Sequence, residues 1–528
     1  MQPGITLGAA KMTRVIYPVE AFTAAERERL HLHFSNLDQP AFAIVGLPET
    51  TKAALFARYS RYPGTLRRLF LDEFAGADAT AADESARASA LFERVFVGYG
   101  DDSVAQLGGA HVACEYVSNV ATKVLERPRL AGYLEQSTRY IAYDEPVPAL
   151  GYRYYRDPEL GPAYEQEMDS LFATYAAMLP RVTAWVDERF ERDPADPPAA
   201  HARAVRAKAL DLVRGVLPAA SLSHVGIFAS GQTYEQLILH LLAHPLPEAR
   251  RYGRMILEAV RAVIPSFVAR VEQPDRGGAW VGHLERRDGT ARTVAERLGL
   301  RDDDGADGTS VTLLHAHGDE RHALAALLFE VATVSERQAA ARLAELDDEQ
   351  VTALFTELVG ERANRRHRPG RGLESLHYRF EIISDYGAFR DLQRHRMLTV
   401  QWQSLTPDLG AGVPEELDAA GVGDAYRAAL ECSAATYRSL TGPAAAYALC
   451  LGFRIRYILE LNAREAMHVI ELRSGREGHP GYRAIAHELH RLIATVHPRI
   501  AAAMHHVDTS VEPRLERIAA ELRSERAR

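Results

Sequence analysis

Residues 394–404 read RHRMLTVQWQS, and residues 127–137 in the first half of the chain read RPRLAGYLEQS. In both stretches two arginines flank a third residue, and a serine follows after seven further positions, at Ser404 and at Ser137. Each basic triplet also comes at the end of a predicted helix, over residues 115–126 and 386–393. The shared pattern predicts a diverged tandem repeat.

The elements around the two stretches follow the same order in both halves. An amphipathic helix comes first, then a mixed segment with strand-like alternation, a helix ending in the basic triplet, and further helices. Long apolar helices are expected over residues 217–242 and 448–474, and the better strand candidates are residues 310–315 and 377–383. We therefore expect an α+β fold in which helix predominates.

Glycine and aspartate crowd into the stretch between about Pro274 and Ser310. Such a composition is typical of a connection between domains. We place an N-terminal repeat at residues 1–274, a linker at 275–309 and a C-terminal repeat at 310–528.

Charge and cysteine content exclude several classes of protein. The chain of 528 residues has 62 basic and 71 acidic side chains, a balance that argues against coating nucleic acid through bulk charge. Its three cysteines, Cys114, Cys432 and Cys450, fit neither a disulfide framework nor a zinc motif. The first thirty residues lack the apolar core of a signal peptide, and the longest apolar run is too short to span a membrane. We expect a cytoplasmic protein without nucleic-acid or membrane partners.

An isolated R-H-R triplet is weak evidence for function, and the chain contains a second one at residues 366–368. The serine nearest to that triplet, Ser375, falls one residue short of the required spacing. Only the triplet at 394–396 meets the full pattern. We interpret residues 366–368 as a basic loop.

Two ordered markers in the second half resemble the flavin-dependent thymidylate synthases. Arg394-His395-Arg396 with Ser404 resembles that family's signature, and NAREAMHVIELR at residues 462–473 resembles its flavin-binding helix. In the first half, EQSTRY at 135–140 resembles the family's nucleotide-phosphate loop, RGVLP at 214–218 its second phosphate-binding arginine, and ARYS at 57–60 its early A-R-x-S motif. The resemblance implies that each half is built like one family subunit, a helical core with an antiparallel β-sheet.

The resemblance also implies a reaction and a set of site residues. A methylene group would move from methylenetetrahydrofolate to dUMP to give dTMP, with NADPH reducing a bound FAD. The implied FAD-binding residues are Arg394, His395, Arg396, Asn462, Arg464, His468, Ser103 and Gln236. The implied dUMP-binding residues are Glu135, Gln136, Ser137, Thr138, Arg139, Arg214, Ser404 and Arg473, and Arg473 is also the implied catalytic group that helps to ionise the uracil. No metal is expected.

Each half departs from the family pattern in a different place. The first half has Pro128 where the triplet histidine should be and Ser230-Gly231-Gln232 in place of N-A-R, so it has lost most of the cofactor groups. The second half has LTP after Ser404 and Ala446 in place of the second phosphate arginine, so it has lost the phosphate clamp. Because the losses are complementary, we expect one composite site that joins groups from both halves, whereas its mirror site would be dead.

The residue types suit this chemistry. A bidentate guanidinium matches a phosphate better than lysine does, a role for Arg139 and Arg214 beside the Ser137 hydroxyl. Arg394 and Arg396 are the corresponding donors for the flavin diphosphate. Asn462 and Arg473 stand eleven positions apart, about 16 Å along a helix and on nearly the same face. No cysteine lies in these motifs, which excludes a cysteine nucleophile there.

Several of these signals have a plainer alternative. The triplet at 394–396 is also typical of a solvated helix end, and Glu135 and Arg139 stand four apart, as in a surface ion pair. Asn462 and Arg464 also suit an ordinary amphipathic helix. His487 and His490 lack the spacing of an H-E-x-x-H zinc motif.

Three functions remain open at this point. The first is a fused flavin-dependent thymidylate synthase with one working composite site, which two chains would assemble into a pseudotetramer. The second is a diverged family member that acts on another nucleotide. The third is a non-catalytic nucleotide-binding or scaffolding protein. Whether the composite site closes within one chain or between two also stays open.

Overall fold

A computed structural model describes residues 20–74, 104–300, 308–510 and 514–526. These residues form two compact units. The first unit contains the described residues within 1–112, 228–240 and 253–282, and the second contains those within 113–227, 241–252 and 283–528. None of the described helices is both long and apolar enough to span a lipid bilayer.

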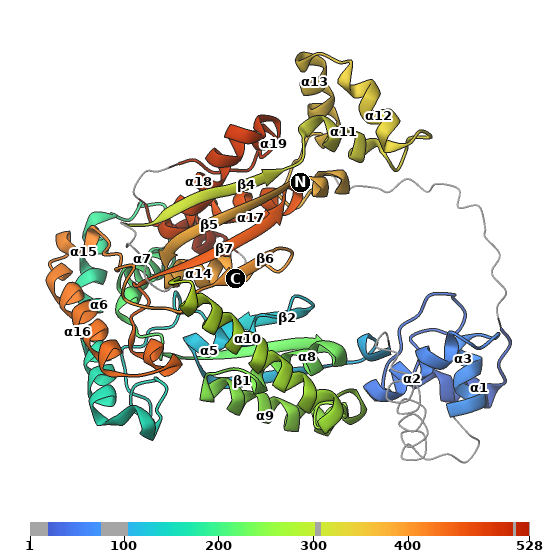
Figure 1. Cartoon of the computed structure of the whole chain (residues 1–528), viewed down its shortest axis with the longest axis horizontal. Coiled ribbons are helices and arrows are strands. Elements are labelled where there is room, and N and C mark those ends of the chain that lie inside the picture. The colour runs from blue at the N-terminus through green and yellow to red at the C-terminus, as the bar shows by residue number, and fades with distance from the viewer. Residues whose placement is uncertain (1–19, 75–103, 301–307, 511–513, 527–528) are drawn as a thin grey trace. The chain divides into compact units, whose positions relative to one another are not determined.

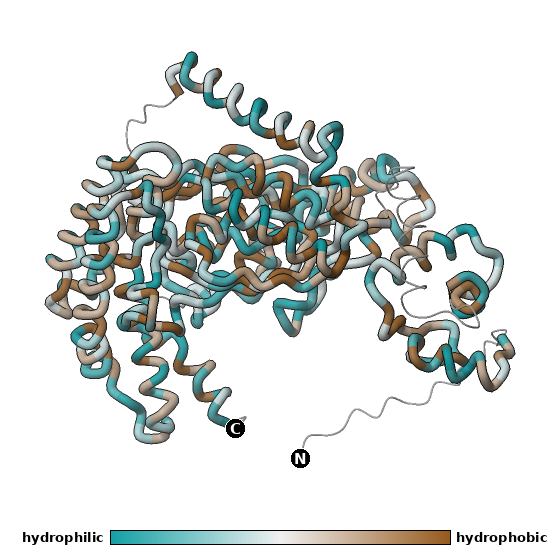
Figure 2. Tube along the Cα trace, turned by 90° about the horizontal axis from the view of Figure 1, so that it is seen from below, coloured by the Kyte–Doolittle hydropathy of each residue, from teal (hydrophilic) through white to brown (hydrophobic). Residues whose placement is uncertain are grey.

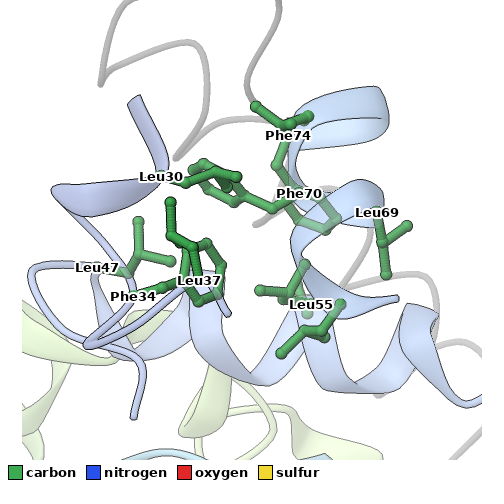
Figure 3. Packing of buried hydrophobic residues seen from close by; sticks show 11 residues of the cluster. Leu30, Phe34, Leu37, Leu47, Leu55, Leu69, Phe70 and Phe74 are labelled. Carbon is green, nitrogen blue, oxygen red and sulfur yellow. The ribbon is translucent and has the colours of Figure 1, made fainter. Parts of the chain in front are cut away.

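A cluster of leucine and phenylalanine side chains forms a core in the first unit (Figure 3). Phe34 and Phe70 meet edge to face with their ring centroids 5.5 Å apart, a geometry that aromatic rings prefer. The predicted ARYS motif lies here, and Arg58 pairs with Glu73 at 2.7 Å. The helical elements over this part of the chain are α1 (Ala24–His31), α2 (Glu49–Tyr59), α3 (Leu66–Leu69), η1 (Phe70–Phe74), η3 (Val104–Gln106), η6 (Pro265–Phe267) and η7 (Pro274–Gly278).

The order of elements repeats along the chain, and the fold class is α+β as predicted (Figure 1). The first half has β1 (Gly109–Ser118), α5 (Asn119–Leu125), β2 (Ala131–Glu135), α7 (Pro198–Val213), η5 (Arg214–Val216), β3 (Leu222–Ser230) and α8 (Gly231–Leu242). The second half has β5 (His377–Asp385), α14 (Tyr386–Leu392), β6 (Thr399–Trp402), α16 (Gly423–Ser439), η9 (Pro443–Ala448), β7 (Arg454–Asn462) and α17 (Ala463–Arg473). The sheets have matching strand orders, β1-β3-β2 and β5-β7-β6, and β4 (Ser310–His317) adds to the edge of the second beside β5.

Other elements extend this repeated frame. The first half has an additional 29-residue helix, α6 (Gly161–Arg189), which packs on α7 and α16. Helix α18 (Pro480–Val496) packs on α17 and β4. Brown hydrophobic and teal hydrophilic residues alternate along the helices in Figure 2, as amphipathic spacing predicts. The remaining elements are η4 (Pro158–Leu160), α9 (Pro247–Val263), α10 (Ala279–Arg297), α11 (Glu320–Leu328), α12 (Glu336–Ala344), α13 (Asp348–Val359), η8 (Arg371–Ser375), α15 (Glu416–Ala419), α19 (Pro498–Ala502) and α20 (Ile518–Arg526).

The prediction of two long apolar helices was wrong. Residues 217–242 contain strand β3 followed by helix α8, and residues 448–474 contain β7 followed by α17. The helix predicted from residue 115 begins only at Asn119, after β1. Alternate residues of β7 are buried, which is the period of a strand that has one covered face.

Strands β1, β3, β5 and β7 are each followed directly by a helix, and the last residue of each strand explains this change. Ser118, Ser230, Asp385 and Asn462 each accept a hydrogen bond from the backbone N–H three residues later, at 3.0, 3.4, 2.8 and 2.9 Å. A Ser, Asp or Asn oxygen in this position caps the first turn of a helix. These caps are short-range signals in the sequence that period alone did not reveal.

The remaining secondary-structure predictions concern two strands, one helix and the linker. The strands predicted over residues 310–315 and 377–383 are confirmed as β4 and β5. The helix predicted over residues 386–393 is confirmed as α14. The predicted linker at 275–309 contains helix α10.

Two repeat-related segments pair with each other in the second unit. Residues 215–220 run antiparallel to residues 447–452, and Pro218 stands opposite Cys450. Four backbone hydrogen bonds of 2.7–3.1 Å join them: Gly452 N to Gly215 O, Leu451 N to Leu217 O, Ala219 N to Leu449 O, and Ala220 N to Tyr447 O. The halves are thus aligned through equivalent segments, much as two copies meet across a symmetric interface.

A buried carboxylate adds a polar link between the halves. Glu248 is fully buried and accepts hydrogen bonds from Ser118 N at 2.9 Å, Ser118 Oγ at 2.6 Å and Tyr447 Oη at 2.6 Å. Burial raises the pKa of Glu248 even though these donors act in the other direction. These hydrogen bonds give the buried polar groups of Glu248, Ser118 and Tyr447 partners that they would otherwise lack.

Replacing Tyr447 by Phe should lower the free energy of unfolding by about 1–3 kcal/mol, because Glu248 loses a buried hydrogen-bond partner while the aromatic ring is kept. Urea denaturation followed by circular dichroism measures the change. Tyr437→Phe on α16 is the matched control and should change stability by less than about 0.5 kcal/mol. Equal shifts in the two variants would contradict this role for the Tyr447 hydroxyl.

Candidate functional site

Four arginines from the two halves lie close together within the second unit. Two of them come from the first half, after β2 and at the start of η5, and two come from the second half, after α14 and at the end of α17. We call this group, Arg139, Arg214, Arg394 and Arg473, the arginine cluster. Asp391 lies near both Arg214 and Arg394, whereas Asp211 pairs with Arg139 and Glu135 pairs with Arg394.

Glu135 lies at the end of β2 with a fully buried side chain. Its oxygens accept hydrogen bonds from Lys123 at 3.1 Å, Arg390 at 3.0 Å and Arg394 at 3.0 Å. Burial alone would raise the pKa of Glu135, but Arg390, Lys123 and Arg394 hold it well below its ordinary range. This implied substrate contact thus binds three cations of the protein and joins β2 of the first half to α14 of the second.

Arg139, after β2, forms a two-pronged pair with a carboxylate. Its Nε donates to Asp211 Oδ1 at 2.7 Å and its Nη2 to Asp211 Oδ2 at 2.6 Å. Its Nη1 donates to the Tyr482 hydroxyl at 3.2 Å. Although burial opposes it, Arg139 keeps the pKa of Asp211 lowered, so the carboxylate stays charged. The planar guanidinium is therefore already engaged by a bidentate anion.

Arg214, at the start of η5, is buried but incompletely paired. Its Nη1 lies 3.9 Å from Asp391 Oδ2, and its Nη2 has no hydrogen-bond partner among the described residues. Arg214 also lines a cavity of about 270 Å³ together with Asp211, Asp385 and His479. A buried guanidinium nitrogen without a partner is costly unless something else occupies it. Arg214 is therefore a strong candidate to bind an anion.

Burial shifts the pKa of two groups that line this cavity, Asp385 and His479, toward their neutral forms. Burial raises the pKa of Asp385, and burial together with Arg214 lowers the pKa of His479 to about 3. His479 Nδ1 accepts a hydrogen bond from Gly481 N at 3.1 Å, so the neutral ring carries its proton on Nε2. The Arg214 guanidinium thus shares this cavity with the neutral His479 ring and with the carboxylate of Asp211.

Arg473 and His395 bring the ends of α14 and α17 together. Arg473 Nε donates to His395 Nε2 at 2.9 Å, and Arg473 Nη2 donates to the backbone oxygen of Asp391. Burial and the Arg473 charge lower the pKa of His395 to about 3. The ring is neutral and, since it accepts at Nε2, its proton lies on Nδ1. The guanidinium of Arg473 also stacks over the Tyr482 ring at 5.3 Å.

His395, Glu465 and His468 form a group whose ligand atoms all lie within 4.8 Å of one another. Two features make it a poor cation site. His395 offers its lone pair to Arg473, and Arg368 lies 3.8 Å from Glu465. A histidine ligand normally donates its other ring N–H to an acceptor, the reverse of the Arg473 contact. Burial lowers the pKa of His468 to about 4, so its ring is neutral at pH 7, and burial raises the pKa of Glu465.

The remaining residues of the implied flavin site differ in exposure and in how many contacts they make within the protein. Arg394 is 38% exposed, and Arg396 lies over the Tyr133 ring at 5.7 Å. The Asn462 side chain caps α17, and Arg464 donates to Pro369 O at 2.9 Å and to Glu374 at 3.3 Å. Asn462 and Arg464 therefore have structural roles already.

Gln236 belongs to the first unit, and its backbone oxygen lies 2.8 Å from His240 Nδ1. Ser103 lies outside the described residues.

Residues of the implied phosphate loop also make contacts within the protein. The Ser137 Oγ accepts from Arg139 N at 3.3 Å, Gln136 N donates to His224 O, and Thr138 is buried. Ser404 is exposed after β6.

The two arginines of the first triplet contact β6. Arg127 lies over the Trp402 ring at 5.4 Å, and Arg129 donates to Thr399 Oγ1 at 3.0 Å. This triplet therefore contributes to packing between the halves.

Motif comparison missed the carboxylates that organise the cluster. Asp211 stands three residues before Arg214, and Asp391 stands three residues before Arg394. For Asp391 and Arg394 this spacing was a usable signal, because Asp391 Oδ1 lies 3.7 Å from Arg394 Nη1, whereas Asp211 binds Arg139 instead of Arg214. Lys123 and Arg390, which hold Glu135, lie outside every motif.

Fold and cluster together define a tandemly repeated α+β protein in which both halves contribute to one arginine-rich site. A family model described as thymidylate synthase complementing protein matches the chain twice, at residues 52–266 and 313–499. The chain therefore belongs to this family, as a tandem duplication.

Relatives span almost the whole chain. A UPF0159 protein of Chlamydia pneumoniae is 36% identical over 526 residues, which cover 96% of this chain and 98% of that protein. A UPF0159 protein of Chlamydia muridarum is 36% identical over 510 residues, covering 93% of this chain and 96% of the relative. One from Thermoplasma acidophilum is 29% identical over 505 residues, covering 89% and 98%. Both halves thus occur together in these relatives.

Replacing Glu135 by Gln should lower the free energy of unfolding at pH 7 by about 3–5 kcal/mol, because the buried Lys123 and Arg390 and the partly exposed Arg394 lose the buried negative charge that they share. The folded pKa of Glu135 lies below its unfolded value of about 4.3. Its contribution is therefore complete above that value and is lost as the pH falls through the folded pKa. Denaturation of both proteins between pH 7 and pH 3 should show their difference shrinking below about pH 4.

The exposed Glu145, ten residues along, offers the matched control. Glu145→Gln should leave stability within about 0.5 kcal/mol of the unaltered protein. A Glu135→Gln effect that stayed constant down to pH 3 would show that the loss does not come from the charge.

Proposed function

We propose that this protein is a flavin-dependent thymidylate synthase-like enzyme that methylates dUMP to dTMP, using methylenetetrahydrofolate and NADPH through FAD, at the arginine cluster. One observation carries the proposal. Arg214 from the first half and Arg394 and Arg473 from the second meet around Asp391, although more than 170 positions separate Arg214 from Arg394 in the sequence. Each half alone has only part of this set.

The residues at the ends of α14 and α17 fit a flavin. Arg394 and Arg396 are two partly accessible guanidinium groups two positions apart, suitable donors for a diphosphate. His395 and His468 are neutral and half-buried or buried, so they add polar contacts without charge. A bound, reduced flavin would supply the hydride that completes the methyl group.

The protein groups would bind and polarise the nucleotide. Arg214 has an unpaired Nη2 for the phosphate. Arg473 is fixed by His395 and by the backbone of Asp391, so its charge is preorganised toward negative charge developing on the pyrimidine. Burial around Arg214 and His395 strengthens such interactions by excluding water.

A second function is favoured by the pairing of Arg139. Arg139 already donates two hydrogen bonds to the Asp211 carboxylate. The implied phosphate loop therefore has less unpaired positive charge than its sequence suggests. That observation favours a diverged family member that takes a different nucleotide. A panel of nucleoside monophosphates distinguishes the two proposals, since the second predicts turnover with a base other than uracil.

We also propose that two chains assemble into a pseudotetramer of four repeats. Light scattering on the purified protein should give twice the mass of 58.4 kDa. A monomeric mass under conditions that support activity would contradict the assembly.

Titration with FAD in the presence of dUMP tests the proposed function. The flavin absorbance bands should saturate at about one FAD per chain, and dTMP should form when methylenetetrahydrofolate and NADPH are added. Arg473→Lys should reduce turnover about a hundredfold while FAD remains bound, because a preorganised donor is lost. Arg394→Lys should weaken FAD binding about tenfold, because a bidentate contact is lost.

The second R-H-R triplet supplies a matched control. Arg366 is exposed, so Arg366→Lys should leave both FAD binding and turnover within twofold of the unaltered protein. Absence of FAD binding under every condition would overturn the proposal and leave the scaffolding alternative.

A further inference from the structure

Asp391 differs from the other carboxylates of the site in how it is held. Asp211 and Glu135 form close hydrogen bonds of 2.6–3.1 Å with their cations. The Asp391 oxygens instead lie 3.7 Å from Arg394 Nη1 and 3.9 Å from Arg214 Nη1, both longer than a hydrogen bond. Its carboxylate therefore keeps its capacity to accept hydrogen bonds.

The groups that face Asp391 come from several elements, and most of them are donors. Its pKa is lowered to about 2 because Arg394, Arg214, Arg473 and Arg139 outweigh the effect of burial, so it is ionised at neutral pH. His479, at the start of α18, and Asp385, before α14, also act on it electrostatically. The titratable and charged groups around Asp391 are Arg139, Arg214, Asp385, Arg394, Arg473 and His479.

The Asp391 carboxylate, which accepts hydrogen bonds, lies among guanidinium groups that donate them. This arrangement limits which anions can bind there. A fully ionised anion gains from the guanidinium groups but meets the negative charge of Asp391 without a proton between them. An anion that carries an ionisable proton can donate it to the Asp391 carboxylate as a short, charge-assisted hydrogen bond. Phosphate monoesters retain such a proton below their second pKa of about 6, whereas sulfate has none at neutral pH.

We propose that Asp391 is a specificity-determining residue that makes the arginine cluster select a singly protonated phosphate monoester over fully ionised anions. The inference rests on the proposed function, in which this cluster binds the phosphate of a nucleotide. The phosphate O–H donates to an Asp391 oxygen, Arg214 donates to another phosphate oxygen, and no covalent bond forms or breaks. Asp391 thereby excludes sulfate and dianionic ligands that the arginines alone would accept.

Competition on the full-length protein tests this inference. Binding of dUMP is measured by calorimetry from pH 6 to pH 8, with inorganic phosphate and sulfate as competitors at constant ionic strength. Affinity for dUMP should fall about tenfold per pH unit above pH 7, since one proton is taken up with the ligand. Phosphate should compete at least about tenfold better than sulfate, as loss of one charge-assisted hydrogen bond implies. The pKa values of His395 and His479, both about 3, lie outside this pH range.

Asp391→Asn removes the charge and keeps the shape of the side chain. Sulfate should then compete within about threefold of phosphate, and the dependence on pH should flatten, because a dianion is accepted. Asp424→Asn is the matched control, since that carboxylate is fully exposed on α16. It should preserve both the preference and the pH dependence of the unaltered protein.

The outcomes separate this inference from the proposed function. If dUMP binds but sulfate competes as well as phosphate, or the affinity is independent of pH, the role of Asp391 is overturned while nucleotide binding stands. If dUMP binds neither protein, the proposed function itself is overturned. The competition in the unaltered protein decides the matter even if Asp391→Asn does not fold.

Discussion

The antiparallel pairing of residues 215–220 with residues 447–452 is the constraint on which the site depends. Backbone hydrogen bonds fix the register of these equivalent segments. The elements that flank one segment are therefore held next to the elements that flank the other. Arg214 immediately precedes the first segment, and β7, which leads into α17, begins soon after the second. One local pairing thereby brings together side chains that are far apart in sequence.

Bringing so many arginines together requires anions from the protein itself. Guanidinium groups this close repel one another in a partly dry interior. Glu135 and Asp211 are held tightly and balance Lys123, Arg390 and Arg139, whereas Asp391 is held loosely among Arg214, Arg394 and Arg473. The tight pairs build the scaffold, and the loosely held carboxylate stays available to a ligand. The closeness of each ion pair thus distinguishes the structural carboxylates from the carboxylate that is available to a ligand.

The tandem duplication explains why motifs in the two halves now differ in role. In the first half, Arg127 and Arg129 pack against β6 of the second half. In the second half, the corresponding Arg394 reaches Glu135 of the first and remains partly exposed. Once both halves are in one chain, each copy of a motif can change independently, so one copy serves packing while the other faces a ligand.

The sequence by itself determined the repeat, the α+β class, strands β4 and β5, helix α14 and the family, because these follow from short-range spacing and residue type. It misjudged the strand-to-helix junctions at Ser230 and Asn462, since an apolar run has no clear period and only the cap marks the change. Only tertiary structure decided that Asp211 binds Arg139, that three cations surround Glu135 and that Asp391 stands loosely among the arginines. Apart from Lys123 with Glu135 and Asp391 with Arg394, those contacts join residues separated by dozens to hundreds of positions. Their strength depends on distance and burial, which no local pattern encodes.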